Sequence, residues 1–175
     1  FQLKNLVEGY VNKGNEGVEG LGGRLDIRPP YQREFIYDDA RQQAVIDSVT
    51  SGFPLGIMYW VDRKDGTYEV LDGQQRILSI CQFYNRDFSM KHSGTPVYFD
   101  GMTTEEREKF INYELDVYIC SGTEREKLKW FERINVVGVP LTAQELRNAS
   151  YTGPWLASAK SYFSKDVAAI DKYNE

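Results

Sequence analysis

The chain has 175 residues, 41% of them hydrophobic and 14% aromatic, so it can bury a core and is not a disordered protein. Its net charge of −5 argues against strong unaided binding to DNA phosphates, but it is compatible with a local basic pocket for a nucleotide. No run of 18 apolar residues occurs, which excludes an apolar membrane-spanning helix.

Cysteine and histidine are scarce. Cys81 and Cys120 lie far apart in apolar surroundings, so we expect two reduced thiols in a cytoplasmic protein. The single histidine, His92, lies in a polar loop and cannot by itself form a histidine-based metal site or an HNH-type nuclease centre. Because the chain begins at Phe1 and ends in a polar stretch, we expect it to be part of a longer protein.

The first predicted element is an amphipathic helix near the start of the chain. A glycine-rich stretch, Gly14–Gly23, follows and is predicted to be a flexible loop. It has no Gly-Lys-Ser/Thr after it, so it is not a Walker A loop. Leu25 and Ile27 then alternate into Pro29-Pro30, which indicates an extended segment. The apolar residues that define the helix are Leu3, Leu6, Val7, Tyr10 and Val11.

The central part of the chain predicts a helix, a hairpin and a second helix. Asp38 and Asp39 are candidate N-caps for a helix that Gly52 closes. Two apolar strands are then predicted on either side of a loop that contains Asp65-Gly66. From Gln74 the apolar period changes from two to 3.6, so Asp72-Gly73 joins a strand to a helix. The two strands are Leu55–Val61 and Tyr68–Leu71, with the loop at Asp62–Thr67.

The remaining elements are two short strands and three helices, each helix opened by a Thr-x-x-Glu capping box. This pattern predicts an α+β fold, with a small mixed β-sheet flanked by helices and then a helical C-terminal part. We place the boundary near residue 122, between a core of residues 1–122 and a helical extension of residues 123–175. The strands are Val97–Phe99 and Tyr113–Ile119, the boxes are Thr103/Glu106, Thr123/Glu126 and Thr142/Glu145, and the last two helices are Glu124–Asn135 and Ala143–Ala149.

The strand-to-helix junction Asp72–Arg76 is the strongest candidate for a binding site. A helix N-terminus carries a partial positive charge and attracts anions. Gly73 permits a sharp turn, Gln74 and Gln75 add amide groups, and Arg76 brings a planar fork suited to phosphate. Asp72 is a candidate ligand for a metal ion, a ribose hydroxyl or an arginine. The alternative is an ordinary turn with Asp72 as N-cap and Arg76 on a solvated face.

Two further segments accompany this junction. Tyr31-Gln32-Arg33 follows the extended proline segment, so two arginines from different elements are candidates to grip one polyphosphate. Arg33 is otherwise a surface ion-pair partner for Asp38 or Asp39. Asn135 ends a helix before a glycine loop, where a simple C-cap is the favoured interpretation.

Three separated motifs in one order carry a family resemblance. They are Ile-Arg-Pro-Pro-Tyr-Gln-Arg at residues 27–33, Leu-Asp-Gly-Gln-Gln-Arg at 71–76, and Phe-Glu-Arg-Ile-Asn at 131–135 followed by Gly-Val-Pro-Leu-Thr-Ala-Gln-Glu-Leu-Arg-Asn-Ala at 138–149. From about Leu3 to about Trp155 the chain resembles the N-terminal domain of GmrSD-type modification-dependent restriction enzymes.

The resemblance implies a ParB/sulfiredoxin-like fold and hydrolysis of nucleoside triphosphates in an anti-phage restriction system. It implies that DNA cleavage resides in a C-terminal HNH-type domain or a separate nuclease subunit, and that modified DNA is the target. Matched residue by residue, Tyr31, Gln32 and Arg33 fall in the first motif, Asp72–Arg76 in the second, and Phe131 and Asn135 in the third.

The roles we infer for these residues come from their chemistry. Arg33 and Arg76 would clamp phosphates, Gly73 and Gln74 would supply backbone donors, and Gln75 would orient the attacking water. Asp72 would organise Mg²⁺ or Arg33. No general base stands out, so we expect slow hydrolysis. The alternatives are a regulatory module that binds nucleotide without significant hydrolysis, and a DNA-recognition domain.

Overall fold

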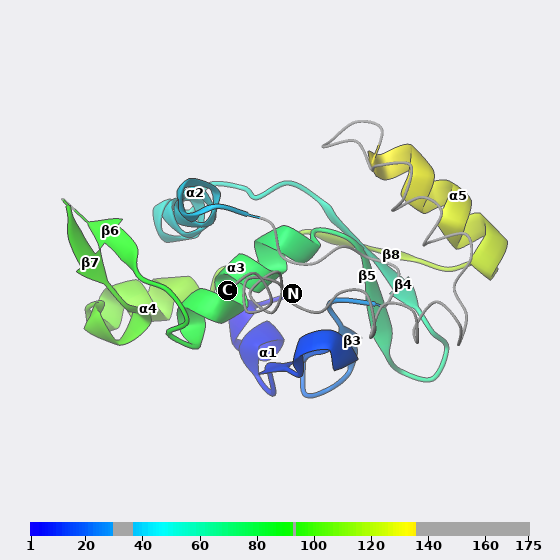
Figure 1. Cartoon of the computed structure of the whole chain (residues 1–175), viewed down its shortest axis with the longest axis horizontal. Coiled ribbons are helices and arrows are strands. Elements are labelled where there is room, and N and C mark those ends of the chain that lie inside the picture. Colours follow the sequence, from blue (N-terminus) through cyan, green and yellow to red (C-terminus); the bar gives the residue numbers. More distant parts are fainter. Residues whose placement is uncertain (30–36, 93, 136–175) are drawn as a thin grey trace, which may run out of the picture.

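The computed structural model describes residues 1–29, 37–92 and 94–135 (Figure 1). Its α-helices are α1 (Leu3–Val7), α2 (Asp39–Ser51), α3 (Gln74–Tyr84), α4 (Thr104–Ile111) and α5 (Glu124–Asn135), and its 3₁₀ helices are η1 (Gly14–Glu16) and η2 (Phe99–Gly101). Its strands are β1 (Val11–Asn12), β2 (Val18–Gly20), β3 (Leu25–Asp26), β4 (Met58–Asp62), β5 (Tyr68–Asp72), β6 (Met90–His92), β7 (Thr95–Val97) and β8 (Val117–Cys120).

Six of these strands form one sheet in the order β1-β2-β3-β5-β4-β8, and β6 pairs with β7 in a separate hairpin. The sheet is mixed, because β3 runs parallel to β5 and β8 runs parallel to β4, whereas the other neighbours are antiparallel. The predicted α+β class with a mixed sheet is therefore confirmed. The ParB/sulfiredoxin-like assignment and the domain boundary near residue 122 stay predictions.

The hydrophobic core lies on one face of this sheet. The side chain of Trp60 in β4 is fully buried there with residues of α1 and α3, and Phe83 of α3 contacts Phe99 and Phe110, which extends the core to α4. Helix α5 lies on the other side of β4 (Figure 1). Its Trp130 contacts Tyr59 of β4. The central strands β4 and β5 thus have helices on both sides.

Local signals in the sequence set the starts of three helices. The side chain of Asp38 accepts a hydrogen bond from the Arg41 N–H at the start of α2, and Gly52 caps its end with a φ of 75°. Thr103 and Glu106 form the predicted capping box of α4. Thr123 and Glu126 make the same reciprocal hydrogen bonds before α5. The third predicted box and the helix after it lie outside the described residues.

The prediction for the N-terminal segment is wrong in two places. The first helix ends at Val7 rather than continuing to Val11, because Gly9 adopts a φ of 65° and Val11 joins β1. The predicted flexible loop Gly14–Gly23 contains η1 and β2. Strand β2 pairs with both β1 and β3, and the side chain of Val18 is buried, so sheet pairing outweighs the glycine content.

Other differences concern where strands begin and end. The strand predicted over Leu55–Val61 begins only at Met58, the one predicted over Tyr113–Ile119 begins at Val117, and the one predicted at Val97–Phe99 ends at Val97. His92, predicted in a loop, is the exposed last residue of β6. In the described ranges, no helix is long and apolar enough to cross a membrane.

Candidate functional site

The junction between β5 and α3 depends on a glycine. Gly73 is the N-cap of α3 and has a φ of 102°, a conformation that side chains other than hydrogen disfavour. A Cβ at this position would lie 2.8 Å from Cγ and 3.0 Å from Sδ of Met58. Backbone and packing therefore both require glycine here. Because glycine has no side chain, α3 begins without the side-chain cap that opens α2, α4 and α5.

A β-bulge precedes the glycine. Tyr59 of β4 pairs with Asp72, but Trp60 pairs with Val70, so Leu71 is the extra residue in β5. The shift sets Asp72 beside Tyr59 and away from the face that carries the main core. Bulges commonly redirect side chains next to functional sites. Here the bulge brings the last residue of β5 to the face of the sheet on which α5 lies.

Arg76 is held in place by four oxygen atoms. Its Nη2 donates to Asp72 Oδ2 at 2.8 Å and to the Ile57 carbonyl at 3.4 Å. Its Nη1 donates to the Leu55 carbonyl at 2.6 Å and to the Gly56 carbonyl at 3.4 Å. The side chain is only 20% exposed, so it does not lie on a solvated helix face. These carbonyls belong to residues 55–57, directly before β4 begins at Met58.

The alternative interpretation of Asp72 as the helix N-cap is also wrong, because the N-cap is Gly73 and the Asp72 carboxylate binds Arg76. The arrangement is an i,i+4 ion pair that spans the strand end and the first helical turn. One positive and one negative charge therefore meet at the point where the α3 macrodipole is positive.

The two glutamines of the motif point into the protein. The side chains of Gln74 and Gln75 are 5% and 7% exposed. Gln75 Oε1 accepts a hydrogen bond from the Tyr37 N–H at 3.3 Å. Tyr37 is the first described residue after the stretch that contains Tyr31, Gln32 and Arg33, and these three residues lie outside the described ranges.

Asn135 is the last residue of α5, and its side chain lies outside the described part of the chain, as does that of Phe131. The structure therefore brings together Asp72, Gly73, Gln74, Gln75 and Arg76. It does not report on the four other predicted site residues, which are Tyr31, Gln32, Arg33 and Asn135. Within the described ranges, no group of three or more His, Cys, Asp or Glu side chains is placed to hold a metal ion.

Sequence reasoning missed an aromatic cluster beside Asp72. Tyr59 of β4, Tyr118 of β8 and Trp130 of α5 form it, and we call these three residues the aromatic cluster. The ring centroids of Tyr59 and Tyr118 are 6.0 Å apart, and those of Tyr59 and Trp130 are 5.9 Å apart in an edge-on arrangement. Large aromatic residues in three separate elements give no local pattern, so only the folded structure shows that they meet.

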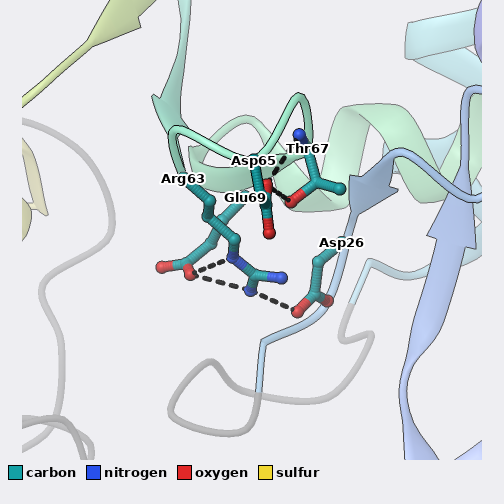
Figure 2. Close-up of polar contacts among 5 residues, drawn as sticks. All are labelled: Asp26, Arg63, Asp65, Thr67 and Glu69. Atoms are coloured by element: carbon teal, nitrogen blue, oxygen red, sulfur yellow. Dashed lines mark hydrogen bonds and ion pairs between the residues drawn. The ribbon is translucent and has the colours of Figure 1, made fainter.

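A second charged cluster, also missed, lies at the opposite end of β5 (Figure 2). Arg63 of the hairpin loop donates from Nη2 to Asp26 Oδ2 at 2.7 Å and to Glu69 Oε2 at 2.8 Å. Asp26 and Glu69 are register partners in the parallel strands β3 and β5. We call Asp26, Arg63 and Glu69 the hairpin cluster.

The hairpin cluster is partly buried, and its electrostatics reflect this. Burial raises the pKa of Asp26, and the hydrogen bond from Arg63 offsets part of that rise. The hairpin loop is held by its own bonds, because Asp65 accepts from the N–H of Thr67 at 2.9 Å and from its hydroxyl at 2.6 Å (Figure 2). These contacts close the turn between β4 and β5.

Comparison with known proteins shows which family contains the β5–α3 junction. Comparison with curated proteins and with solved structures finds no match. The family model described as the GmrSD restriction endonuclease N-terminal domain matches residues 7–152, which include β5, the glycine junction and all three sequence motifs. This match covers most of the chain, so the chain belongs to the family of GmrSD restriction endonuclease N-terminal domains.

Proposed function

We propose that this domain binds a nucleoside triphosphate at Asp72–Arg76 and hydrolyses it slowly with Mg²⁺. The nucleotide would serve a GmrSD restriction system, in which DNA cleavage belongs to a further nuclease domain or a separate subunit. The observation that carries the proposal is the geometry of Arg76. Its guanidinium is held by Asp72 at the first turn of α3, which follows a glycine with a positive φ packed against Met58.

The positive helix end and the guanidinium together favour a phosphate group. Gly73 is buried against Met58, and the first turn of α3 that follows it contributes its dipole. A phosphate oxygen carries negative charge and is a stronger acceptor for Arg76 than the neutral carbonyls of Leu55, Gly56 and Ile57. Nucleotide binding would therefore exchange some of these carbonyl contacts for phosphate contacts. Tyr31, Gln32, Arg33 and Asn135 remain proposed members of the same site.

A single carboxylate is sufficient for the proposed metal ion. Mg²⁺ in nucleotide sites is commonly held through one or two carboxylates together with the substrate phosphates. Asp72 fits this requirement, because its side chain is 32% exposed and only its Oδ2 is bonded to Arg76 at 2.8 Å. The ion would neutralise charge on the phosphates. Asp72 would meanwhile keep Arg76 oriented toward them.

One observation favours the alternative of binding without significant hydrolysis. We assigned Gln75 the task of orienting the attacking water, but its side chain is 7% exposed and its Oε1 accepts from the Tyr37 N–H. A glutamine in this position supports the fold of the site more directly than it activates a water molecule. On this alternative, the bound nucleotide acts as a conformational signal, and Gln75 couples it to the segment that precedes α2.

The test is a titration of the chain with each of the four NTPs and Mg²⁺, followed by equilibrium binding and by phosphate release. We expect saturable binding, and slow phosphate release that requires Mg²⁺. Asp72→Asn keeps an acceptor for Arg76 but removes the charge, so it should slow phosphate release by about tenfold or more while weakening binding less. Binding without phosphate release would select the alternative function. Absence of binding for every NTP would refute the proposal.

A further inference from the structure

The aromatic cluster continues directly from the proposed phosphate site. Asp72 is the register partner of Tyr59, and Tyr59 is the register partner of Tyr118 in the next strand. Neighbouring strands lie about 4.8 Å apart, so Tyr118 stands roughly 10 Å from the Asp72 backbone across the sheet. Because register partners share a face of the sheet, all three side chains lie on the same side.

The cluster keeps large aromatic surface open to solvent. Tyr118 is 61% exposed and Trp130 is 40% exposed, and both contact the half-buried Tyr59 between them. Aromatic side chains on a folded protein usually bury their faces, because their large apolar area gives most of its stabilisation only when it leaves water. An aromatic group that stacked on Tyr118 or Trp130 would remove this area from water.

The rings are also held in position. Tyr118 belongs to β8, which is hydrogen-bonded to β4, and Tyr59 packs against it at 6.0 Å. Trp130 meets Tyr59 edge-on at 5.9 Å. A stacking partner would therefore meet rings that are already ordered, and it would lose little binding energy in ordering them.

We propose that the aromatic cluster, Tyr59, Tyr118 and Trp130, is the subsite for the nucleobase of the nucleotide whose phosphates bind at Asp72–Arg76. The inference rests on the proposed function and adds to it the second half of the ligand. The base stacks on Tyr118 and Trp130, and the sugar spans the width of β4 to reach Asp72. Every nucleobase has a π-face, so a site built from stacking tolerates all four bases.

Charge supports a nucleotide over a nucleic acid strand as the occupant. A single-strand binding surface combines stacking rings with a basic groove that follows many phosphates. The charged groups described along these strands include the hairpin cluster, with two carboxylates to one guanidinium, and the Asp72–Arg76 ion pair, and the chain carries a net charge of −5. One triphosphate needs only the local positive end of α3 and Arg76. A mononucleotide, with one base for the aromatic cluster and one polyphosphate for Asp72–Arg76, fits both the stacking surface and the limited positive charge.

The experiment compares nucleotide with inorganic tripolyphosphate. We expect Tyr118→Leu to weaken binding of ATP and of the other NTPs by roughly 5- to 100-fold, the range typical of one lost base-aromatic stack. Its affinity for tripolyphosphate should stay unchanged, and Tyr118→Phe should bind like the wild type because the ring is retained. Tyr98→Leu is the matched control, since Tyr98 is 49% exposed and lies before η2, outside the cluster.

The possible results distinguish a failure of the proposed base subsite from a failure of the proposed phosphate site. If Tyr118→Leu binds NTPs as tightly as the wild type, or loses NTP and tripolyphosphate equally, the base subsite is wrong and the phosphate site stands. If the wild-type chain binds neither ligand, the proposed function fails and the subsite with it. A variant that loses a single-stranded oligonucleotide but keeps NTP affinity would assign the cluster to nucleic acid instead and overturn the inference. Tyr118→Leu and Tyr98→Leu are first compared by thermal unfolding, so that a loss of fold is not read as a loss of stacking.

Discussion

The two ends of β5 each carry an arginine bound to carboxylates, but the charges balance differently. At the hairpin end, Arg63 lies between two carboxylates, those of Asp26 and Glu69, which leaves a formal charge of −1 in the cluster. At the other end, Arg76 binds one carboxylate, Asp72, and three neutral carbonyls. The hairpin cluster therefore has a net negative charge, which repels a further anion. The Asp72–Arg76 pair is neutral and lies at the positive end of a helix.

This difference shows that an arginine-carboxylate pair does not by itself indicate a site. Arg63 joins β3, β5 and the hairpin loop, so its contacts hold the sheet together. Arg76 joins the start of α3 to the loop at residues 55–57, and these carbonyl contacts can be exchanged for phosphate contacts without breaking a strand pair. We therefore assign a structural role to the Arg63 end of β5 and ligand binding to the Arg76 end.

The glycines near the two ends provide the largest expected contrast. In Gly73→Ala, the alanine must adopt a positive φ and its Cβ lies 2.8 Å from Met58 Cγ. In Gly66→Ala, in the hairpin loop, the alanine must adopt a φ of 85°, but its Cβ has no atom within 4 Å. We expect Gly73→Ala to lower the unfolding free energy by about 3 kcal/mol, from strain plus overpacking. Gly66→Ala should cost about 1 kcal/mol from strain alone.

Denaturant unfolding of both variants measures this contrast. Equal costs would mean that Met58 yields to the added methyl group and that the junction is looser than its contacts indicate. A larger cost at Gly66 would reverse the comparison between the two ends.

The hairpin cluster predicts a smaller effect, on the pH dependence of stability. Burial raises the pKa of Asp26 above its ordinary value of 3.8, so the folded state holds this proton more tightly than the unfolded state does. Its favourable contribution to stability is therefore fully present below pH 3.8 and is lost as the pH rises through the higher pKa of the folded state.

The unfolding free energy of the wild type relative to Asp26→Asn should fall across this pH window. Arg63→Gln should steepen the fall, because the hydrogen bond from Arg63 lowers the pKa of Asp26. The measurement is denaturant unfolding at a series of pH values from acid to neutral. A relative stability that rises with pH in this range would contradict the assignment.

Local features of the fold were predictable from the sequence. The caps of α2 and α4 and the Gly73 junction depend on residues within one turn of one another, so a short stretch of sequence is enough to predict them. The β4-β5 hairpin was predictable for the same reason, since its loop is closed by neighbouring residues, Asp65 and Thr67. Strand ends were less accurate, because they depend on partners elsewhere in the chain.

The missed features depend on contacts between distant residues. Strand β2 forms within a glycine-rich stretch because β1 and β3 pair with it. The contact of Arg76 with Leu55 and the pairing of Asp26 with Glu69 join separate elements, and no spacing in the sequence marks them. Of the candidate site, the residues Asp72–Arg76 were found from their own motif. The carbonyls that hold Arg76 and the aromatic cluster appear only once the sheet order is known.

The most direct test of the central claim is nucleotide affinity in two matched variants, Arg76→Gln and Arg63→Gln. Both remove one positive charge and keep an amide donor. Strand β5, five residues long, spans about 16 Å, which is beyond the roughly 8 Å screening length at physiological salt. Arg63→Gln should therefore bind NTP with Mg²⁺ as the wild type does. Arg76→Gln should bind roughly 10- to 100-fold more weakly, from the loss of charge-assisted hydrogen bonds to phosphate. Wild-type affinity in a folded Arg76→Gln chain, or equal losses in the two variants, would contradict a phosphate site at Asp72–Arg76.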